Sequence, residues 1–382
     1  MAELLAADHA FVNTSCEIFF CHLSLLHFPA LSRALRAHTP SRRPPPRSRP
    51  RSRRSTCSTY PTAGTPPRPA APNEGADVIT VVGESLIDLV GPAAGRTFAS
   101  LPGGSPANVA VGLARLGNQV TLATHLGDDT FGRLVREHLE CSGADVRILP
   151  GPKEPTSLAI ATLDTEGVAD YDFRIAWDLH ELPVLDSSCQ AVHTGSLATT
   201  LAPGADVLEA FMAAEHTRGA VTLSLDPNIR PSLLPPRAEV VARVERQVAM
   251  VDVVKVSSED VAWLHPGEKD TEVARRWLAS GPALVVVTRG AAGAWAVTAA
   301  GEARQPASPV KAVDTVGAGD AFTAGVLDWL GRAGLLGGAR RGELAGLDGR
   351  ALSDLLRTAT VIAGITCTRQ GAEPPTRTEI AA

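Results

Sequence analysis

From residue 77 onward the chain repeats one pattern, in which a short run of Val, Ile and Leu precedes a segment with apolar residues at helical spacing. Near-continuous apolar runs are typical of strands buried on both faces, and their alternation with helices favours parallel pairing. The pattern therefore predicts an α/β domain with a mostly parallel central sheet between helices. The predicted strands are 78–83, 120–124, 191–195, 221–226, 253–256 and 284–288. The predicted helices include 108–116, 131–142, 205–218 and 238–250.

Polar residues stand at the carboxyl ends of several of these predicted strands. In a parallel sheet those ends lie along one edge, where the ligands of α/β proteins bind. The pattern therefore predicts a ligand site that is assembled from several strands. The polar residues at this edge are Glu84, Asp226, Asn228 and Thr288.

Two parts of the chain interrupt the α/β pattern. Residues 156–163 and 169–174 alternate as strands do, on either side of a turn at 164–167. Residues 86–101 also fit short strands joined by a glycine turn. Periodicity predicts these strands but does not say how they pack.

The composition excludes several classes of function. The chain has 382 residues, enough for one large or two ordinary domains. Its formal net charge of -5 argues against a nucleic-acid or membrane partner for the main body. The cysteines are scattered and form no C-x-x-C pair, which argues against a zinc site and a disulfide framework. We therefore expect a protein of the reducing cytoplasm.

The beginning of the chain has a different composition from the rest. Residues 33–72 are dense in Arg, Pro, Ser and Thr, and such a segment cannot bury enough apolar surface to fold. The apolar stretch 18–31 is short for a membrane span and lacks a basic leader. We interpret residues 1–76 as a disordered extension from an upstream start, with an organelle transit peptide as the alternative. The domain is then 77–382.

One glycine-rich stretch carries a specific chemistry. Residues 314–320 read D-T-V-G-A-G-D, and apolar residues at helical spacing follow. Gly317, Ala318 and Gly319 are expected to present backbone N–H groups at a helix N-terminus, which favours an anion. Asp320 would then stand beside a phosphate, where its task is to accept the proton of an attacking hydroxyl. The alternative is a tight turn in which Asp320 is an ordinary N-cap.

A second motif makes the first more specific. Residues 102–117 read P-G-G-S-P-A-N-V-A-V-G-L-A-R-L-G, which puts a Gly-Gly turn and an Asn at the start of another helix. Together the two motifs resemble the signatures of the ribokinase-like (PfkB) carbohydrate kinases. The resemblance implies a three-layer α/β fold, a small β-sheet lid from pieces near 86–101 and 156–175, and ATP with Mg²⁺ as cofactors. A Walker pattern is absent, so a P-loop kinase is excluded.

The resemblance also implies how a sugar is bound. Asp88 is expected to accept hydrogen bonds from sugar hydroxyls, together with Gly103, Gly104 and Asn108. Arg174 is similar to a lid arginine of some sugar and sugar-acid kinases. Helix capping is the alternative for Asn108, and an exposed strand cation is the alternative for Arg174.

The nucleotide residues follow from the same resemblance. The D-P-N-I-R segment at 226–230 resembles a segment that lines the phosphate region, and T-R-G-A-A-G at 288–293 resembles a nucleotide loop. Turn formation is the alternative for both segments. The C-terminal segment that begins at residue 367 resembles the adenine and monovalent-cation region. The expected nucleotide-binding residues are Asn228, Arg230, Thr288, Gly290, Gly293 and Cys367.

The magnesium residues depart from the family pattern. Where the family has N-x-x-E, this chain has Ser257 and Asp260. Both keep oxygen ligands that suit a hard cation. The alternative is a helix cap at Ser257 or Ser258 with Asp260 in the first turn. The resemblance leaves a dependence on K⁺ open.

Among carbohydrate kinases the chain looks most like a fructokinase. Its expected partners are ATP and a small sugar, and a homodimer is one of the oligomeric states left open. A kinase for ribose, 2-keto-3-deoxygluconate or another sugar acid is the alternative enzyme. A sensor of sugar or nucleotide without turnover is the other alternative. A Rossmann dehydrogenase is disfavoured because no G-x-G-x-x-G follows the first strand.

Overall fold

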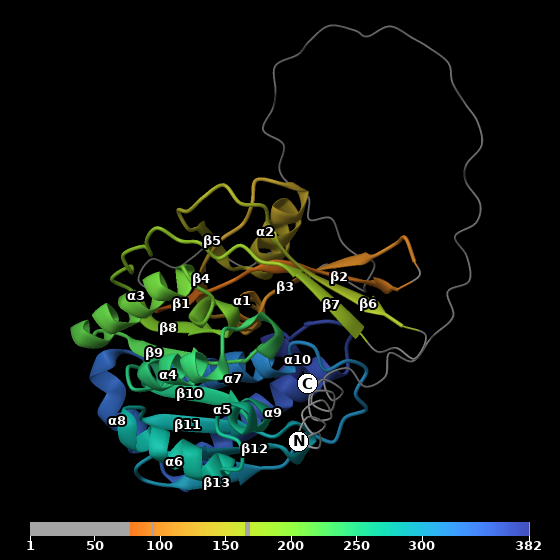
Figure 1. The fold of residues 1–382 in the computed structure, drawn as a ribbon. Coiled ribbons are helices and arrows are strands. Elements are labelled where there is room, and N and C mark those ends of the chain that lie inside the picture. The colour runs from red at the N-terminus through yellow and green to blue at the C-terminus, as the bar shows by residue number, and fades with distance from the viewer. Residues whose placement is uncertain (1–76, 94, 165–168, 382) are drawn as a thin grey trace, which may run out of the picture.

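The computed structural model describes residues 77–93, 95–164 and 169–381 (Figure 1). The predicted disordered extension at 1–76 lies outside them. The described residues form a nine-stranded sheet in the order β13-β12-β11-β10-β9-β8-β1-β4-β5. Its strands are β1 (Val78–Val82), β4 (Gln119–Thr124), β5 (Asp145–Ile148), β8 (Cys189–Gly195), β9 (Thr222–Asp226), β10 (Val253–Ser257), β11 (Leu284–Thr288), β12 (Ala294–Val297) and β13 (Glu302–Gln305).

The central sheet is parallel from β5 to β11, as the apolar runs predict. β12 and β13 close one edge with antiparallel pairing. From β1 the chain first adds β4 and β5 on one side and then β8 to β11 on the other. The strand order therefore reverses beside β1, and ligands of open α/β sheets bind at such a point.

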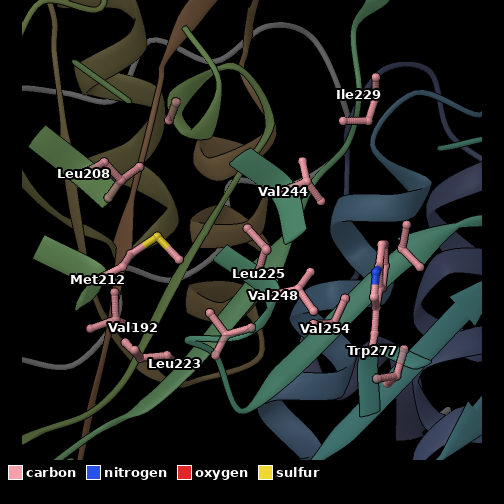
Figure 2. Close-up of a cluster of buried hydrophobic side chains, with 14 of the residues drawn as sticks. Val192, Leu208, Met212, Leu223, Leu225, Ile229, Val244, Val248, Val254 and Trp277 are labelled. Carbon is pink, nitrogen blue, oxygen red and sulfur yellow. The ribbon is translucent and has the colours of Figure 1, made fainter. Parts of the chain in front are cut away.

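Helices cover both faces of this sheet (Figure 1). One face carries α3 (Gly204–Arg218), α4 (Arg237–Val248) and α6 (Asp270–Ser280). Their apolar side chains and those of the strands form the core cluster of Figure 2, which includes Val192, Leu208, Met212, Leu225, Val244, Val254 and Trp277. The other face carries α1 (Ser105–Arg115), α2 (Thr130–Ser142), α7 (Ala318–Arg332) and α9 (Gly349–Cys367).

Short elements complete the described chain. They are η1 (Ser196–Thr199), η2 (Pro231–Leu233), α5 (Ser258–Leu264), η3 (Gly290–Ala292), η4 (Gly338–Arg340), α8 (Arg341–Ala345) and α10 (Arg377–Ala381). None of the helices in the described ranges combines the length and the apolar character that crossing a bilayer requires.

A second, smaller sheet stands apart from the first (Figure 1). Its strand order is β3-β2-β6-β7, from β2 (Leu86–Pro92), β3 (Ala99–Gly103), β6 (Ser157–Leu163) and β7 (Ala169–Arg174). β2 pairs with β3 in antiparallel and with β6 in parallel orientation. These strands agree with those predicted at 86–101, 156–163 and 169–174. The turn predicted at 164–167 lies mostly outside the described residues.

Among the differences between prediction and structure, one helix boundary and one missed strand have identifiable reasons. α1 begins at Ser105 instead of Asn108, because Gly104 takes the cap position with φ 102° and Pro106 fits the first turn. β13 was not predicted, because its polar sequence E-A-R-Q contains no apolar run. By contrast, α2 ends as predicted, since Gly143 takes the left-handed conformation after Ser142.

Candidate active site

The Asp320 carboxyl group lies in the first turn of α7 and is only 7% exposed. Ser105 Oγ donates a hydrogen bond to its Oδ1 at 2.6 Å, and Asn108 Nδ2 donates to its Oδ2 at 2.9 Å. Both donors come from the start of α1, so the two glycine motifs of the sequence meet at this carboxylate. Asn108 therefore contacts Asp320 through its side chain instead of capping α1.

The surroundings of Asp320 suit a proton acceptor. Burial raises the pKa of Asp320 above the usual range of an aspartic acid, while the donors Ser105 and Asn108 and the charge of Lys255 oppose the shift. A raised pKa makes the carboxylate a stronger base than an exposed aspartate. The orientation of the carboxylate is set at both oxygens.

The backbone before Asp320 leaves several N–H donors available. Gly317 is the N-cap of α7 with φ 73°. Ala318 N–H donates to Thr315 O at 3.2 Å, so this amide is already engaged. The N–H groups of Gly317, Gly319 and Asp320 find no acceptor among the described residues. Donors of this kind at a helix N-terminus favour an anion.

The segment that follows α9 packs against the glycine turn at the start of α7. A Cβ on Gly317 would lie 2.4 Å from Ala372 Cβ, so only glycine fits there. Gly371 N–H donates to Asp314 Oδ2 at 2.9 Å, and Cys367 O accepts from Val313 N–H at 2.7 Å. Burial raises the pKa of the Cys367 thiol, in keeping with a packed cysteine instead of a reactive one.

A second carboxylate faces the same region from the smaller sheet. Asp88 lies on β2, and a Cβ on Gly103 would stand 2.1 Å from its Oδ2. Gly103 thus leaves room for this carboxylate, and Gly104, with φ 102°, turns the chain into α1. Burial raises the pKa of Asp88 to about 6, the positive charge of Arg230 opposes the shift, and the negative charge of Asp320 adds to it.

Arg230 follows β9, and its positive charge acts on Asp88 and on Asp260. Its Nη1 donates to the carbonyl oxygens of Asn228 and Ile229, at 3.3 and 3.0 Å. Burial raises the pKa of Asp260, the negative charge of Asp226 adds to the shift, and the charge of Arg230 opposes it, as it does at Asp88. Asn228 adopts φ 41°, a conformation that costs little for Asn and that often marks a functional loop.

Arg174 is the predicted sugar residue for which the described contacts include none with this cluster. It lies at the end of β7, its side chain is 64% exposed, and it pairs with Asp172. It also donates to Phe173 O at 2.9 Å. In this arrangement Arg174 matches the alternative of an exposed strand cation.

The two residues expected near magnesium act in a helix cap. Ser257 is the N-cap of α5, and its Oγ accepts from Asp260 N–H at 2.9 Å. The buried Asp260 accepts at Oδ1 from Ile229 N–H at 3.0 Å. Among the described residues, no three His, Cys, Asp or Glu side chains are grouped to hold a metal. Proteins bind Mg²⁺ mainly through substrate phosphates, water and one or two carboxylates, a role open to Asp260.

The predicted nucleotide loop follows β11. Thr288 pairs with Ser257 in the sheet register, so this loop lies beside the start of α5. Gly290 has φ 51° and open space where a side chain would stand. A Cβ on Gly293 would meet Gln305 O at 2.0 Å, so this glycine is required by packing against β13.

Two residues of the cluster were not assigned by sequence reasoning. Ser105 donates a hydrogen bond to Asp320. Its position directly after the Gly-Gly turn, at the start of a helix, could have indicated a role in the site. Lys255, on β10, is buried and pairs with Asp226. The sequence could have indicated it, because a lysine inside an otherwise apolar strand is rarely buried without a charged partner.

A model of the pfkB family of carbohydrate kinases matches residues 76–379. The chain belongs to this family. It is 34% identical to a fructokinase of Rhizobium leguminosarum bv. trifolii over 285 residues, which cover 72% of this chain and 85% of that protein. The resemblance to ribokinase-like kinases is thereby confirmed, and the chain is an ATP-dependent sugar kinase.

Solved structures agree with the family. Fructokinase from Xylella fastidiosa with bound ATP matches with a TM-score of 0.72 and 28% identity, over 80% of this chain and 97% of that one. Fructokinase from Vibrio cholerae O395 in its fructose, ADP and calcium ion bound form matches with a TM-score of 0.67 and 27% identity, over 80% and 98%. The predicted fold, with a large mostly parallel sheet and a small separate one, is confirmed.

The pKa of Asp88 leads to a prediction about sugar affinity. A carboxylate accepts hydrogen bonds from two hydroxyls, and protonation removes part of that capacity. Because the pKa of Asp88 is raised to about 6, we expect the KM for the sugar to rise as the pH falls through that value. Initial rates measured from about pH 5 to about pH 8 test this.

The matched variant is Asp88→Asn, which keeps the shape and removes the titration. It should have a raised KM for the sugar at every pH and no inflection near pH 6, with the KM for ATP little changed. A wild-type KM that stays constant across this range would contradict the assignment of Asp88 to the sugar.

Proposed function

We propose that this kinase transfers the γ-phosphoryl group of ATP to a hydroxyl of fructose, with Asp320 as the general base. The observation that carries the proposal is the buried Asp320 carboxylate, held by Ser105 and Asn108 in the first turn of α7. The amides of Gly317 and Gly319 stand beside it without acceptors among the described residues. A base and an anion site in contact are what phosphoryl transfer to a hydroxyl needs.

In the proposed step, the hydroxyl proton passes to Asp320 and the hydroxyl oxygen forms a bond to the γ-phosphorus. The bond from that phosphorus to its bridging oxygen breaks, and ADP leaves with the electron pair. The free amides of the turn stabilise the charge of the transferring group. Bound Mg²⁺ would neutralise phosphate charge, with Asp260 and Ser257 as the residues proposed to hold it. A requirement for K⁺, a homodimeric state and a cytoplasmic location stay predictions.

Fructose is preferred because the relatives named above are fructokinases and one of them was solved with fructose. Asp88, Gly103 and Gly104 are the residues proposed to line its pocket. A sugar acid would need a cation for its carboxylate, and Arg174 is paired with Asp172 on an exposed strand. That pairing favours a neutral sugar.

Release of ADP with fructose, ribose, 2-keto-3-deoxygluconate and adenosine tests the substrate. We expect the highest kcat/KM for fructose, because buried polar groups left unpaired by the wrong substrate cost affinity. A higher kcat/KM for any of the other three would contradict the choice of fructose. Binding of sugar and ATP without turnover of any of them would instead support the sensor.

A further inference from the structure

A buried lysine lies next to the proposed anion site. Lys255 extends from β10 and is 5% exposed, and its Nζ donates to Asp226 Oδ2 at 2.8 Å. The same carboxylate oxygen accepts from Thr323 Oγ1 of α7 at 3.4 Å. Asp226 is 1% exposed, so this ion pair is enclosed between β9, β10 and the first turns of α7. An ammonium has three N–H donors, and the described residues provide an acceptor for one of them.

The ammonium borders directly on the glycine turn. A Cβ on Gly319 would lie 3.1 Å from Lys255 Nζ. Apart from the helix backbone and the adjacent residues, Nζ is the only described atom within 4 Å of that position. Gly319 has no left-handed φ that would require glycine, so the lysine is the reason that a side chain is disfavoured there. Nζ thus lies close to Gly319, whose N–H has no acceptor among the described residues.

The unused N–H donors of this corner suit an anion. A helix N-terminus carries a partial positive charge, and a cation beside it is unfavourable. Lys255 stands beside the N-terminus of α7, and the carboxylates of Asp226, Asp320 and Asp260 stabilise its charge there. A phosphoryl group between the ammonium and the turn would engage the two remaining N–H donors and the helix end together.

We propose that Lys255 is a catalytic residue that contacts the transferring γ-phosphoryl group, and that Asp226 is the positioning residue that holds it there. This proposal rests on the kinase function proposed above. The competing explanation is structural, because Lys255 could serve only to neutralise the buried Asp226 carboxylate. Removing one member of a buried pair is costly in either case, so a single variant does not separate the two roles.

Kinetics on an Asp226→Asn background separate them. In that background there is no carboxylate to neutralise, so a purely structural lysine is dispensable. We expect Lys255→Met to lower kcat by about 10²–10³ on both backgrounds, as the loss of a donor to developing charge does. The KM for the sugar should change little. A loss in kcat of less than about tenfold on the Asp226→Asn background would overturn the proposal.

Nucleotide affinity provides a second measurement that needs no sugar. ADP lacks the γ-phosphoryl group, so Lys255→Met should weaken ATP binding by about tenfold or more and leave ADP binding nearly unchanged. Equal changes for ATP and ADP, or no change for either, would overturn the proposal. Lys269→Met is the matched control, because Lys269 is exposed and pairs with Glu272 at the surface. The ATP affinity of this variant should stay at the wild-type value.

The two measurements also distinguish this proposal from the proposed function. If the wild-type protein turns over no sugar, the kinase mechanism fails, and the comparison of ATP with ADP decides on Lys255 by itself. If the wild-type protein is an active kinase and Lys255→Met binds ATP and ADP with the wild-type ratio of affinities, the kinase mechanism is supported. The proposed contact of Lys255 with the γ-phosphoryl group is then wrong.

Discussion

Asp320→Asn should lower kcat by at least about 10², while the affinity for the sugar changes little. The amide keeps the size of the carboxyl group but takes up no proton from the attacking hydroxyl. In the wild type, kcat should fall as the pH drops through the raised pKa of Asp320, because the protonated acid is not a base. The variant should have lost this acidic limb. Rate and sugar binding are measured separately on the same preparation.

The control for Asp320→Asn is Asp206→Asn, the same chemical change in an exposed ion pair with Arg243. Surface pairs contribute little, so this variant should match the wild type in rate and in thermal unfolding. An Asp320→Asn enzyme with more than about a tenth of the wild-type kcat would refute the assignment of the base.

Gly317→Ala should lose both activity and stability. Gly317 has φ 73°, which costs an alanine about 1 kcal/mol, and its Cβ would also stand 2.8 Å from the backbone Cα of Ala372. Relief of that contact must move the turn or the C-terminal segment, and the donors of the anion site move with it. We expect a fall in kcat of about 10² or more and a lower melting temperature.

Gly334→Ala is the matched control, because Gly334 has φ 68° and nothing within 4 Å of the Cβ position. This variant has the same backbone strain without the collision, so it should lose about 1 kcal/mol of stability and keep its kcat. Similar kcat values for the two variants would show that the geometry of the turn at Gly317 does not matter for catalysis.

Local pattern determined most of the fold. The buried strands β1, β10 and β11 were predicted because each is a near-continuous run of apolar residues, which is typical of a covered parallel sheet. The two glycine motifs identified the family, since each specifies a turn and a helix start through residues that are neighbours in sequence. The polar strand β13 escaped prediction, because its position comes from pairing with β12 and not from its own sequence.

The candidate site depended on contacts between distant parts of the chain. Ser105 and Asp320 are 215 positions apart, and no local pattern relates them, yet their side chains meet at 2.6 Å. Arg174 resembled a sugar-binding arginine in sequence, but its neighbour Asp172 on the exposed strand offers it a partner.

Tertiary structure also decided how Lys255 must be interpreted. In the sequence it is a lysine within an apolar run, and a buried ammonium without a partner would be too costly to exist there. Folding places Asp226 of the adjacent strand 2.8 Å away and the glycine turn of α7 on the other side. The sequence by itself determined which segments are strands, helices and turns, because those depend on neighbours along the chain. Tertiary packing alone decided which charged groups lie close together, because that depends on contacts between residues that are distant in sequence.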